Sequence, residues 1–164
     1  MKQVKVLMVC LGNICRSPTA EGVFRTQIQQ QNLSDIISVD SAGTSDWHIN
    51  EAPDSRSAKA AEKRGYDLSQ LRGRQVNVQD FHEFDYVLAM DNENFRNLLA
   101  ICPEEYNHKV KMFLSFGLSE STLNTEQVPD PYHSGLEGFE FVLDLIEDAG
   151  QGLLNEIINT HQLN

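Results

Sequence analysis

Cysteine is scarce in this chain of 164 residues, where it occurs only as Cys10, Cys15 and Cys102. Small secreted domains that rely on disulfides carry a dense framework of cysteines, so three thiols argue against that class. Structural zinc takes about four protein ligands, and only scattered histidines could complete such a set. We therefore expect reduced thiols, one of them available for catalysis, and no metal.

Long hydrophobic runs are also missing. No apolar stretch approaches the roughly 20 residues that a membrane-spanning helix needs. The apolar run at residues 4–11 is too short for the core of a signal peptide, and no cleavage pattern of small residues follows it. A buried first strand accounts for it better, and we expect a cytoplasmic protein with no membrane partner.

Basic residues are rare in the second half of the chain. The net charge is -11, and residues 76–164 hold only 3 of the 13 basic residues but 16 of the 24 acidic ones. Such a charge argues against nucleic acid and anionic membranes as partners. A site that binds anions must therefore be built from the first half.

Short apolar runs and longer amphipathic stretches alternate along the chain. The first kind predicts strands and the second predicts helices. We expect strands at 5–10, 36–39, 84–89 and 110–113, and helices at 18–31, 54–64, 92–102 and 136–158. Strands separated by helices imply parallel strands with right-handed crossovers. Residues 1–164 are therefore predicted to form a single doubly wound α/β domain, in which ligands bind at the carboxyl ends of the strands.

Several polar residues and one glycine mark the expected helix ends. Ser17 is expected to cap the first helix, with Pro18 at its first position. Asp54 and Asp91 are expected to cap the second and third helices. Gly65 is expected to end the second helix in the left-handed conformation.

The loop after the first strand combines the features of an anion-binding site. Residues 10–17 read Cys-Leu-Gly-Asn-Ile-Cys-Arg-Ser. Its backbone N–H groups and the N-terminus of the next helix can converge on an anion without a metal or other cofactor. Gly12 lets the backbone approach closely, and the Arg16 guanidinium can bind two phosphate oxygens at once. The same groups favour the thiolate of Cys10, the form that attacks.

This loop predicts phosphatase chemistry. Attack of Cys10 on phosphorus would give a cysteinyl-phosphate that water hydrolyses, and the Ser17 hydroxyl is placed to donate to the departing sulfur. A cysteine followed six positions later by arginine is a weak signal alone. The strand before it, the glycine within it and the Ser-Pro start of a helix after it make the combination specific. The plain alternative is that Cys10 is a core thiol at the end of a strand.

Residues 9–18, Val-Cys-Leu-Gly-Asn-Ile-Cys-Arg-Ser-Pro, closely resemble the signature of the low-molecular-weight protein tyrosine phosphatases. Residues 40–44, 84–91 and 130–132 resemble later blocks of the family in the same order, so the resemblance covers essentially the whole chain. It implies a four-stranded parallel sheet flanked by helices. The implied ligands are phosphotyrosine proteins or peptides, small aryl phosphates and phosphate-like anions. The sequence does not bear on the oligomeric state.

The resemblance also implies roles for single residues. Cys10 would be the nucleophile, Arg16 would bind the phosphoryl oxygens, and Asp130, held between two prolines, would be the general acid and then the base. Ser17 would stabilise the thiolate, and Ser41 would help Asn13 to brace the loop. The remaining loop residues would contact the phosphate: Leu11, Gly12, Asn13, Ile14 and Cys15.

Aromatic residues are expected to form the walls of the cleft. Tyr132 matches an aromatic wall of the family, and Trp47 lies in its variable specificity loop; burial of Trp47 against the body is the alternative. His133 departs from the family, where a second aromatic residue commonly follows. Cys15 could form a protective disulfide with Cys10, as the resemblance implies, or fill apolar space beneath the loop. The other histidines, among them His48, are expected at the surface.

Three rival functions are compatible with parts of this pattern. Thioredoxin-coupled arsenate reductases need a further pair of redox cysteines, and Cys102 is only one. Bacterial protein-arginine phosphatases typically carry threonine where this chain has Ile14, and the apolar isoleucine favours an aromatic leaving group. A phosphopeptide-binding module without catalysis would be expected to lack Cys10 or Asp130, and both are present.

Overall fold

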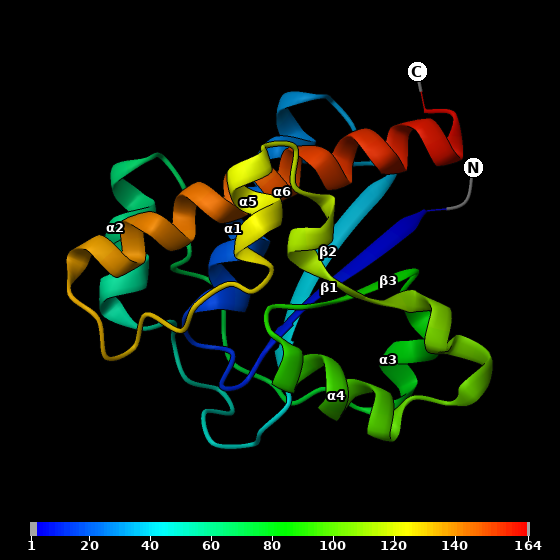
Figure 1. Ribbon diagram of the computed structural model, residues 1–164, viewed down its shortest axis with the longest axis horizontal. Helices are drawn as coiled ribbons and strands as arrows, with labels where there is room; N and C mark the ends of the chain where they lie inside the picture. The colour runs from blue at the N-terminus through cyan, green and yellow to red at the C-terminus, as the bar shows by residue number, and fades with distance from the viewer. Residues whose placement is uncertain (1–2, 164) are drawn as a thin grey trace.

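The described residues, 3–163 of a computed structural model, contain one four-stranded parallel sheet with the strand order β2-β1-β3-β4 (Figure 1). The strands are β1 (Val4–Cys10), β2 (Ile37–Gly43), β3 (Tyr86–Ala89) and β4 (Val110–Met112). β1 pairs with β2 on one side and with β3 on the other, so the strand that ends at Cys10 is internal.

Helices cover both faces of the sheet (Figure 1). The α-helices are α1 (Arg16–Gln30), α2 (Ser55–Lys63), α3 (Val78–Glu83), α4 (Asn92–Ile101), α5 (Glu120–Thr125) and α6 (Leu136–His161), and η1 (Glu104–Lys109) and η2 (Phe113–Phe116) are 3₁₀ helices. α1 and α6 pack on one face, and α3 and α4 on the other. No helix within residues 3–163 is both long enough and apolar enough to cross a bilayer.

β1 is buried on both faces, which explains its unbroken apolar sequence. Val6 and Met8 belong to the core beneath α1 and α6, whereas Leu7 and Val9 belong to the core beneath α3 and α4. Successive side chains of a strand point to opposite faces, and a parallel strand covered by helices on both sides needs apolar residues on both. The packing therefore fixes β1, and with it the position of Cys10.

The expected α/β fold with four parallel strands is confirmed, with differences at the ends of elements. β2 continues four residues beyond the expected strand to Gly43, through a polar and small-residue stretch that carries no apolar signal. The prediction that Ser17 caps the first helix is wrong. α1 begins at Arg16 with Cys15 as its N-cap, because the Ser17 hydroxyl is engaged by Cys10. Pro18 is the third residue of α1 and not the first as expected, but it still lies in the first turn, where its missing N–H removes no helical hydrogen bond.

Other local predictions are confirmed, and short elements were missed. Asp54 and Asp91 cap α2 and α4 with their side chains, and Gly65 has a φ of 89° after α2. The sequence did not predict α3, α5, η1 or η2, which are too short to show a helical period.

Two glycines in the middle of α6 allow close packing of neighbouring elements. A side chain at Gly152 would overlap the carbonyl oxygen of Phe116 in η2, and one at Gly150 would overlap the Gln27 side chain of α1. Glycine within a helix costs about 1 kcal/mol relative to alanine. At Gly150 and Gly152 this cost in helix stability is the consequence of close contacts that bring α6 against α1 and η2.

Replacement of the α2 cap, Asp54→Ala, is expected to lower the free energy of unfolding by about 1 kcal/mol at neutral pH. The carboxylate accepts hydrogen bonds from the N–H groups of Arg56 and Ser57. Partial burial raises the pKa of Asp54, but these bonds and the Arg56 guanidinium lower it on balance. A lowered folded-state pKa gives stability that is present above the unfolded-state pKa and is lost as pH falls through the folded value.

Urea denaturation at neutral and acidic pH measures this effect. Ser55, exposed at the first position of the same helix, provides the control, and Ser55→Ala is expected to change stability by less than about 0.5 kcal/mol. If Asp54→Ala lowers the free energy of unfolding equally at neutral and acidic pH, the negative charge of Asp54 does not contribute to the stability of the helix cap.

Candidate active site

The loop between β1 and α1 forms the floor of a pocket at the carboxyl edge of the sheet. The cavity has a volume of about 270 Å³. Three segments line the pocket: this loop at the floor, and the loop after β2 and the segment before α6 at the walls. The lining residues are Cys10, Leu11, Gly12, Ile14, Cys15, Arg16, Trp47, His48, Asp130, Tyr132 and His133.

Most of the residues predicted for the site therefore meet in one cavity. Asn13, Ser17 and Ser41 do not line it and lie buried beneath the loop. His48, expected at the surface, has a partly exposed ring that lies against Gly12 and lines the pocket, a position in the site that the sequence did not indicate. Trp47 is 67% exposed, so it is a free part of the wall rather than a residue buried against the body.

Cys10 is only 2% exposed and is contacted by two polar groups. Its Sγ lies 3.0 Å from Oγ of Ser17 and 3.3 Å from the backbone nitrogen of Asn13, which donates to it. Asn13 has a φ of 58°, a left-handed conformation that asparagine adopts more readily than most residues. This turn of the chain directs the N–H group of Asn13 at the sulfur.

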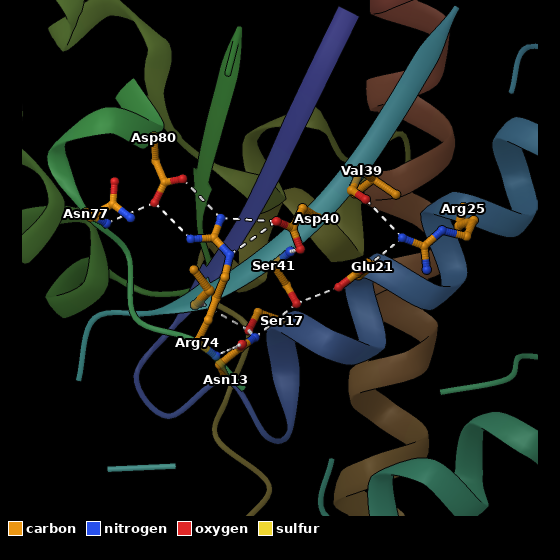
Figure 2. A network of polar contacts seen from close by, with 11 residues as sticks. Asn13, Ser17, Glu21, Arg25, Val39, Asp40, Ser41, Arg74, Asn77 and Asp80 are labelled. Carbon is orange, nitrogen blue, oxygen red and sulfur yellow. Dashed lines mark hydrogen bonds and ion pairs between the residues drawn. The ribbon is translucent and has the colours of Figure 1, made fainter. Parts of the chain in front are cut away.

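The amide of Asn13 joins the loop to two neighbouring segments. Its Nδ2 donates to Oγ of Ser17 at 2.8 Å and to Oγ of Ser41 at 3.0 Å, and its Oδ1 accepts from the backbone N–H of Arg74 at 3.0 Å (Figure 2). The Arg74 guanidinium in turn contacts the carboxylates of Asp40 and Asp80. These contacts hold the left-handed residue in place from both sides.

Arg16 is a buried cation with fixed partners on one side. Its Nη1 donates to Oδ2 of Asp91 at 2.7 Å and to the carbonyl oxygen of Val128 at 3.0 Å. Its Nη2 lies 3.8 Å from Oδ2 of Asp130. Burial opposes the charge, but Cys10 and Asp91 raise the pKa of Arg16 above its ordinary value. The guanidinium therefore stays charged and lines the pocket beside Cys10.

The segment with Asp130 is fastened by an arginine from another element. Asp130 is half exposed, and its Oδ1 accepts from the backbone N–H of Tyr132 at 3.0 Å. The Arg56 guanidinium lies over the ring of Tyr132, 5.3 Å from its centroid, and 4.9 Å from that of Phe139 in α6. Such cation–π contacts tie this wall of the pocket to α2 and α6.

Comparison with known proteins identifies this arrangement. A family model described as low molecular weight phosphotyrosine protein phosphatase matches residues 5–163. The chain belongs to this family. Its relatives are protein-tyrosine phosphatases, and Cys10 and Arg16 fit the Cys-x5-Arg loop of the family.

Individual relatives cover nearly the whole chain. The low molecular weight protein-tyrosine-phosphatase YfkJ of Bacillus subtilis is 38% identical over 160 residues, 98% of this chain and 99% of that protein. A structure of protein tyrosine phosphatase from Entamoeba histolytica with Hepes in the active site is 41% identical, covers 97% of this chain and 99% of that one, and has a TM-score of 0.91. A structure of Drosophila arginine phosphatase is 31% identical, covers 94% and 98%, and has a TM-score of 0.84.

The second thiol of the phosphatase loop, Cys15, is buried and lines the pocket. Burial raises the pKa of Cys15 to about 12, and the charges of Asp54, Cys10 and Asp130 act in the same direction, against a hydrogen bond with Ser57. Cys15 is therefore a thiol at neutral pH. Both cysteines are free in this structure, so the disulfide between them stays a prediction.

Sequence reasoning missed several residues that support the phosphatase site. Asp91 was predicted only as a helix cap, although a carboxylate just after a parallel strand is where site residues gather. Arg56 and Arg74 gave no local signal, because the site residues that they contact, Tyr132 and Asn13, lie far away in the sequence. Among residues 3–163, no three His, Cys, Asp or Glu side chains converge as a metal site requires, and the expected absence of a metal stays a prediction.

The variant Asp91→Asn is expected to weaken binding of inorganic phosphate roughly tenfold, because hydrogen bonds to charged groups contribute about 1.5–3 kcal/mol. Asparagine caps helices as well as aspartate does, so α4 should start as before. The carboxylate uses one oxygen for Arg16 and the other for the N–H of Asn94, so in asparagine one of these two donors faces the NH₂ group instead of an acceptor.

Calorimetric titration with phosphate measures the affinity. Asp35→Asn makes the same charge change at an exposed position and should leave the affinity at the wild-type value. Equal affinities of Asp91→Asn and wild type would show that Arg16 does not depend on its carboxylate partner.

Proposed function

We propose that this phosphatase hydrolyses phosphotyrosine in proteins or peptides, as well as small aryl phosphates, through a cysteinyl-phosphate on Cys10. The observation that carries the proposal is the Cys10 sulfur, which lies on the floor of the pocket beside the Arg16 guanidinium and receives the N–H of Asn13. A tetrahedral anion placed there meets positive charge and a nucleophile together. Hepes, a sulfonate, in the active site of the Entamoeba relative supports an anion at this position.

In the first step, the thiolate of Cys10 attacks phosphorus while Arg16 binds the phosphoryl oxygens. The sulfur–phosphorus bond forms as the bond from phosphorus to the phenolic oxygen breaks. The electron pair of that bond goes to the phenolic oxygen, which takes a proton from Asp130. The half-exposed carboxyl of Asp130 in the pocket wall supports this role.

In the second step, water attacks the phosphorus of the cysteinyl-phosphate and gives its proton to Asp130. The phosphorus–sulfur bond breaks, and inorganic phosphate leaves with the regenerated acid in place. The Ser17 hydroxyl, 3.0 Å from the sulfur, is within reach to donate to the departing thiolate. The enzyme returns to its starting state without any cofactor.

The walls of the pocket favour an aromatic substrate. Trp47 and Tyr132 stand exposed at its rim and Ile14 lies within it, so a flat ring can pack against apolar surface while its phosphate reaches the floor. The rings of His133 and Tyr132 pack in a T-shaped arrangement with their centroids 5.0 Å apart, so His133 takes part in this wall. We also propose a cytoplasmic location, because the nucleophile requires a reduced thiol.

Phosphoarginine is a second candidate substrate, since the Drosophila relative is described as an arginine phosphatase. Ile14 argues against it, because an isoleucine side chain offers no hydrogen-bond partner to a guanidinium. An arsenate reductase relay is disfavoured, because Cys102 packs with the core on the face of the sheet opposite the cluster that holds Cys10. A binding module without catalysis is disfavoured by the presence of both Cys10 and Asp130.

The substrate class is tested by parallel turnover of phosphotyrosine, phosphoserine and phosphoarginine with a metal chelator present. Fast release of phosphate from phosphotyrosine is expected, because only its ring can pack against the pocket walls. Cys10→Ser should abolish turnover and still bind a phosphotyrosine peptide. Preference for phosphoarginine would replace the proposal by its alternative, and full activity of Cys10→Ser would overturn the mechanism.

The acid is tested with Asp130→Asn. We expect kcat/KM for phenyl phosphate to fall roughly 10²–10⁴-fold, the usual contribution of general acid–base catalysis. The loss should be smaller for nitrophenyl phosphate, whose more acidic phenol leaves without a full proton transfer. Asp46→Asn, at an exposed position in the loop that carries Trp47, is the matched control. Equal losses for both substrates would show that Asp130 does not protonate the leaving group.

A further inference from the structure

Glu21 is a buried carboxylate one turn into α1, and the mechanism above does not use it. It is 4% exposed. Its Oε1 accepts from Oγ of Ser41 at 2.6 Å, and its Oε2 accepts from the Arg25 guanidinium at 2.5 Å (Figure 2). Burial raises the pKa of Glu21, and these two hydrogen bonds act against that rise. A buried carboxylate next to a catalytic loop calls for an explanation beyond packing.

The directions of the hydrogen bonds between Glu21 and Cys10 follow from the chemistry of their ends. The backbone N–H of Arg74 can only donate, so it fixes Oδ1 of Asn13 on its side. The two protons on Nδ2 of Asn13 therefore point at the hydroxyl oxygens of Ser17 and Ser41, which must accept them. Each serine proton is left to point elsewhere.

The two serine protons have few acceptors within reach. That of Ser41 goes to Glu21, the carboxylate beside it. That of Ser17 has Sγ of Cys10 at 3.0 Å and the carbonyl oxygen of Ala42 at 3.5 Å, the limit of a hydrogen bond. The closer acceptor is the sulfur, so the chain that begins at Glu21 ends with a proton directed at Cys10.

We propose that Glu21 is a positioning residue that acts on Cys10 through Ser41, Asn13 and Ser17. Glu21 accepts the hydrogen bond that the Ser41 hydroxyl donates. The Ser41 oxygen is then oriented to accept from Asn13, which in turn keeps Asn13 donating to Ser17. The inference deepens the proposed function and rests on Cys10 as the nucleophile. The proposal concerns the direction of hydrogen bonds. A substitution that reverses one of these directions without altering the shape of the side chain should therefore change the reactivity of the Cys10 sulfur.

Arg25 makes such a change possible. In Glu21→Gln, the Arg25 guanidinium, which also donates to the carbonyl oxygen of Val39, has only donors and therefore draws the amide oxygen to its side. The amide NH₂ group then faces Ser41, whose oxygen receives two donors while its own proton has no acceptor. Arg25→Met in the same chain releases the amide, which can rotate its oxygen toward Ser41 again. Arg25 is partly exposed, so its loss leaves no large cavity.

The readout is the rate at which iodoacetate alkylates Cys10, measured by mass spectrometry of the Cys10 peptide as a function of pH and compared on the acidic limb, where the rate is proportional to the thiolate fraction. On that limb, Cys10 of Glu21→Gln should be alkylated about fivefold more slowly than in the wild type, the equivalent of one net hydrogen bond of about 1 kcal/mol to the thiolate. Arg25→Met alone should stay within about twofold of wild type, because a carboxyl without Arg25 can still accept from Ser41. Glu21→Gln with Arg25→Met should return to that same rate.

A wild-type rate for Glu21→Gln would overturn the proposal, and so would failure of the second substitution to restore the rate. Should Glu21→Gln fold poorly by urea denaturation, Ser41→Ala replaces it. That variant should slow alkylation to a similar degree, and the addition of Glu21→Gln should then change nothing further. Additive losses would overturn the proposal. Alkylation needs no turnover, so these outcomes are independent of whether phosphotyrosine is the substrate.

Discussion

The cation of Arg16 lies almost out of contact with water, and the arrangement of the site depends on its ion pair with Asp91. A buried guanidinium is costly unless charged and polar partners surround it. Asp91 and the carbonyl oxygen of Val128 hold one side of the group, which leaves the rest to face the pocket. The positive charge that an anion meets at Cys10 is therefore held in place before the anion arrives.

The parallel sheet brings these groups together because its strands all end at one edge. Cys10 ends β1, Ser41 lies near the end of the neighbouring β2, and Asp91 follows β3 on the other side. Two faces of buried side chains fix β1 between its neighbours. The loop after Cys10 thus begins from a rigid strand and ends in a rigid helix, which suits a nucleophile that must not move.

The polar groups beneath the loop illustrate how a buried network can fix one conformation. Both amide protons and the amide oxygen of the left-handed Asn13 have partners; Arg74 ends the network on one side and Glu21, reached through Ser41, ends it on the other (Figure 2). A network of this kind favours a single arrangement, because any flipped group leaves a buried donor or acceptor without a partner. The pocket wall that carries Tyr132 is more exposed, and there Arg56 contacts the rings of Tyr132 and Phe139.

Local sequence determined the elements whose signals are local: the strand that ends at Cys10, the anion loop with Arg16, the left-handed Gly65 and the caps of α2 and α4. The resemblance to the family added Asp130. Only the tertiary structure decided which distant groups complete the site, because folding and not spacing brings Asp91 to Arg16, the ring of His48 into the pocket wall and the guanidinium of Arg56 onto Tyr132. The same holds for Glu21, whose burial and hydrogen-bond direction depend on a strand that follows it in the chain.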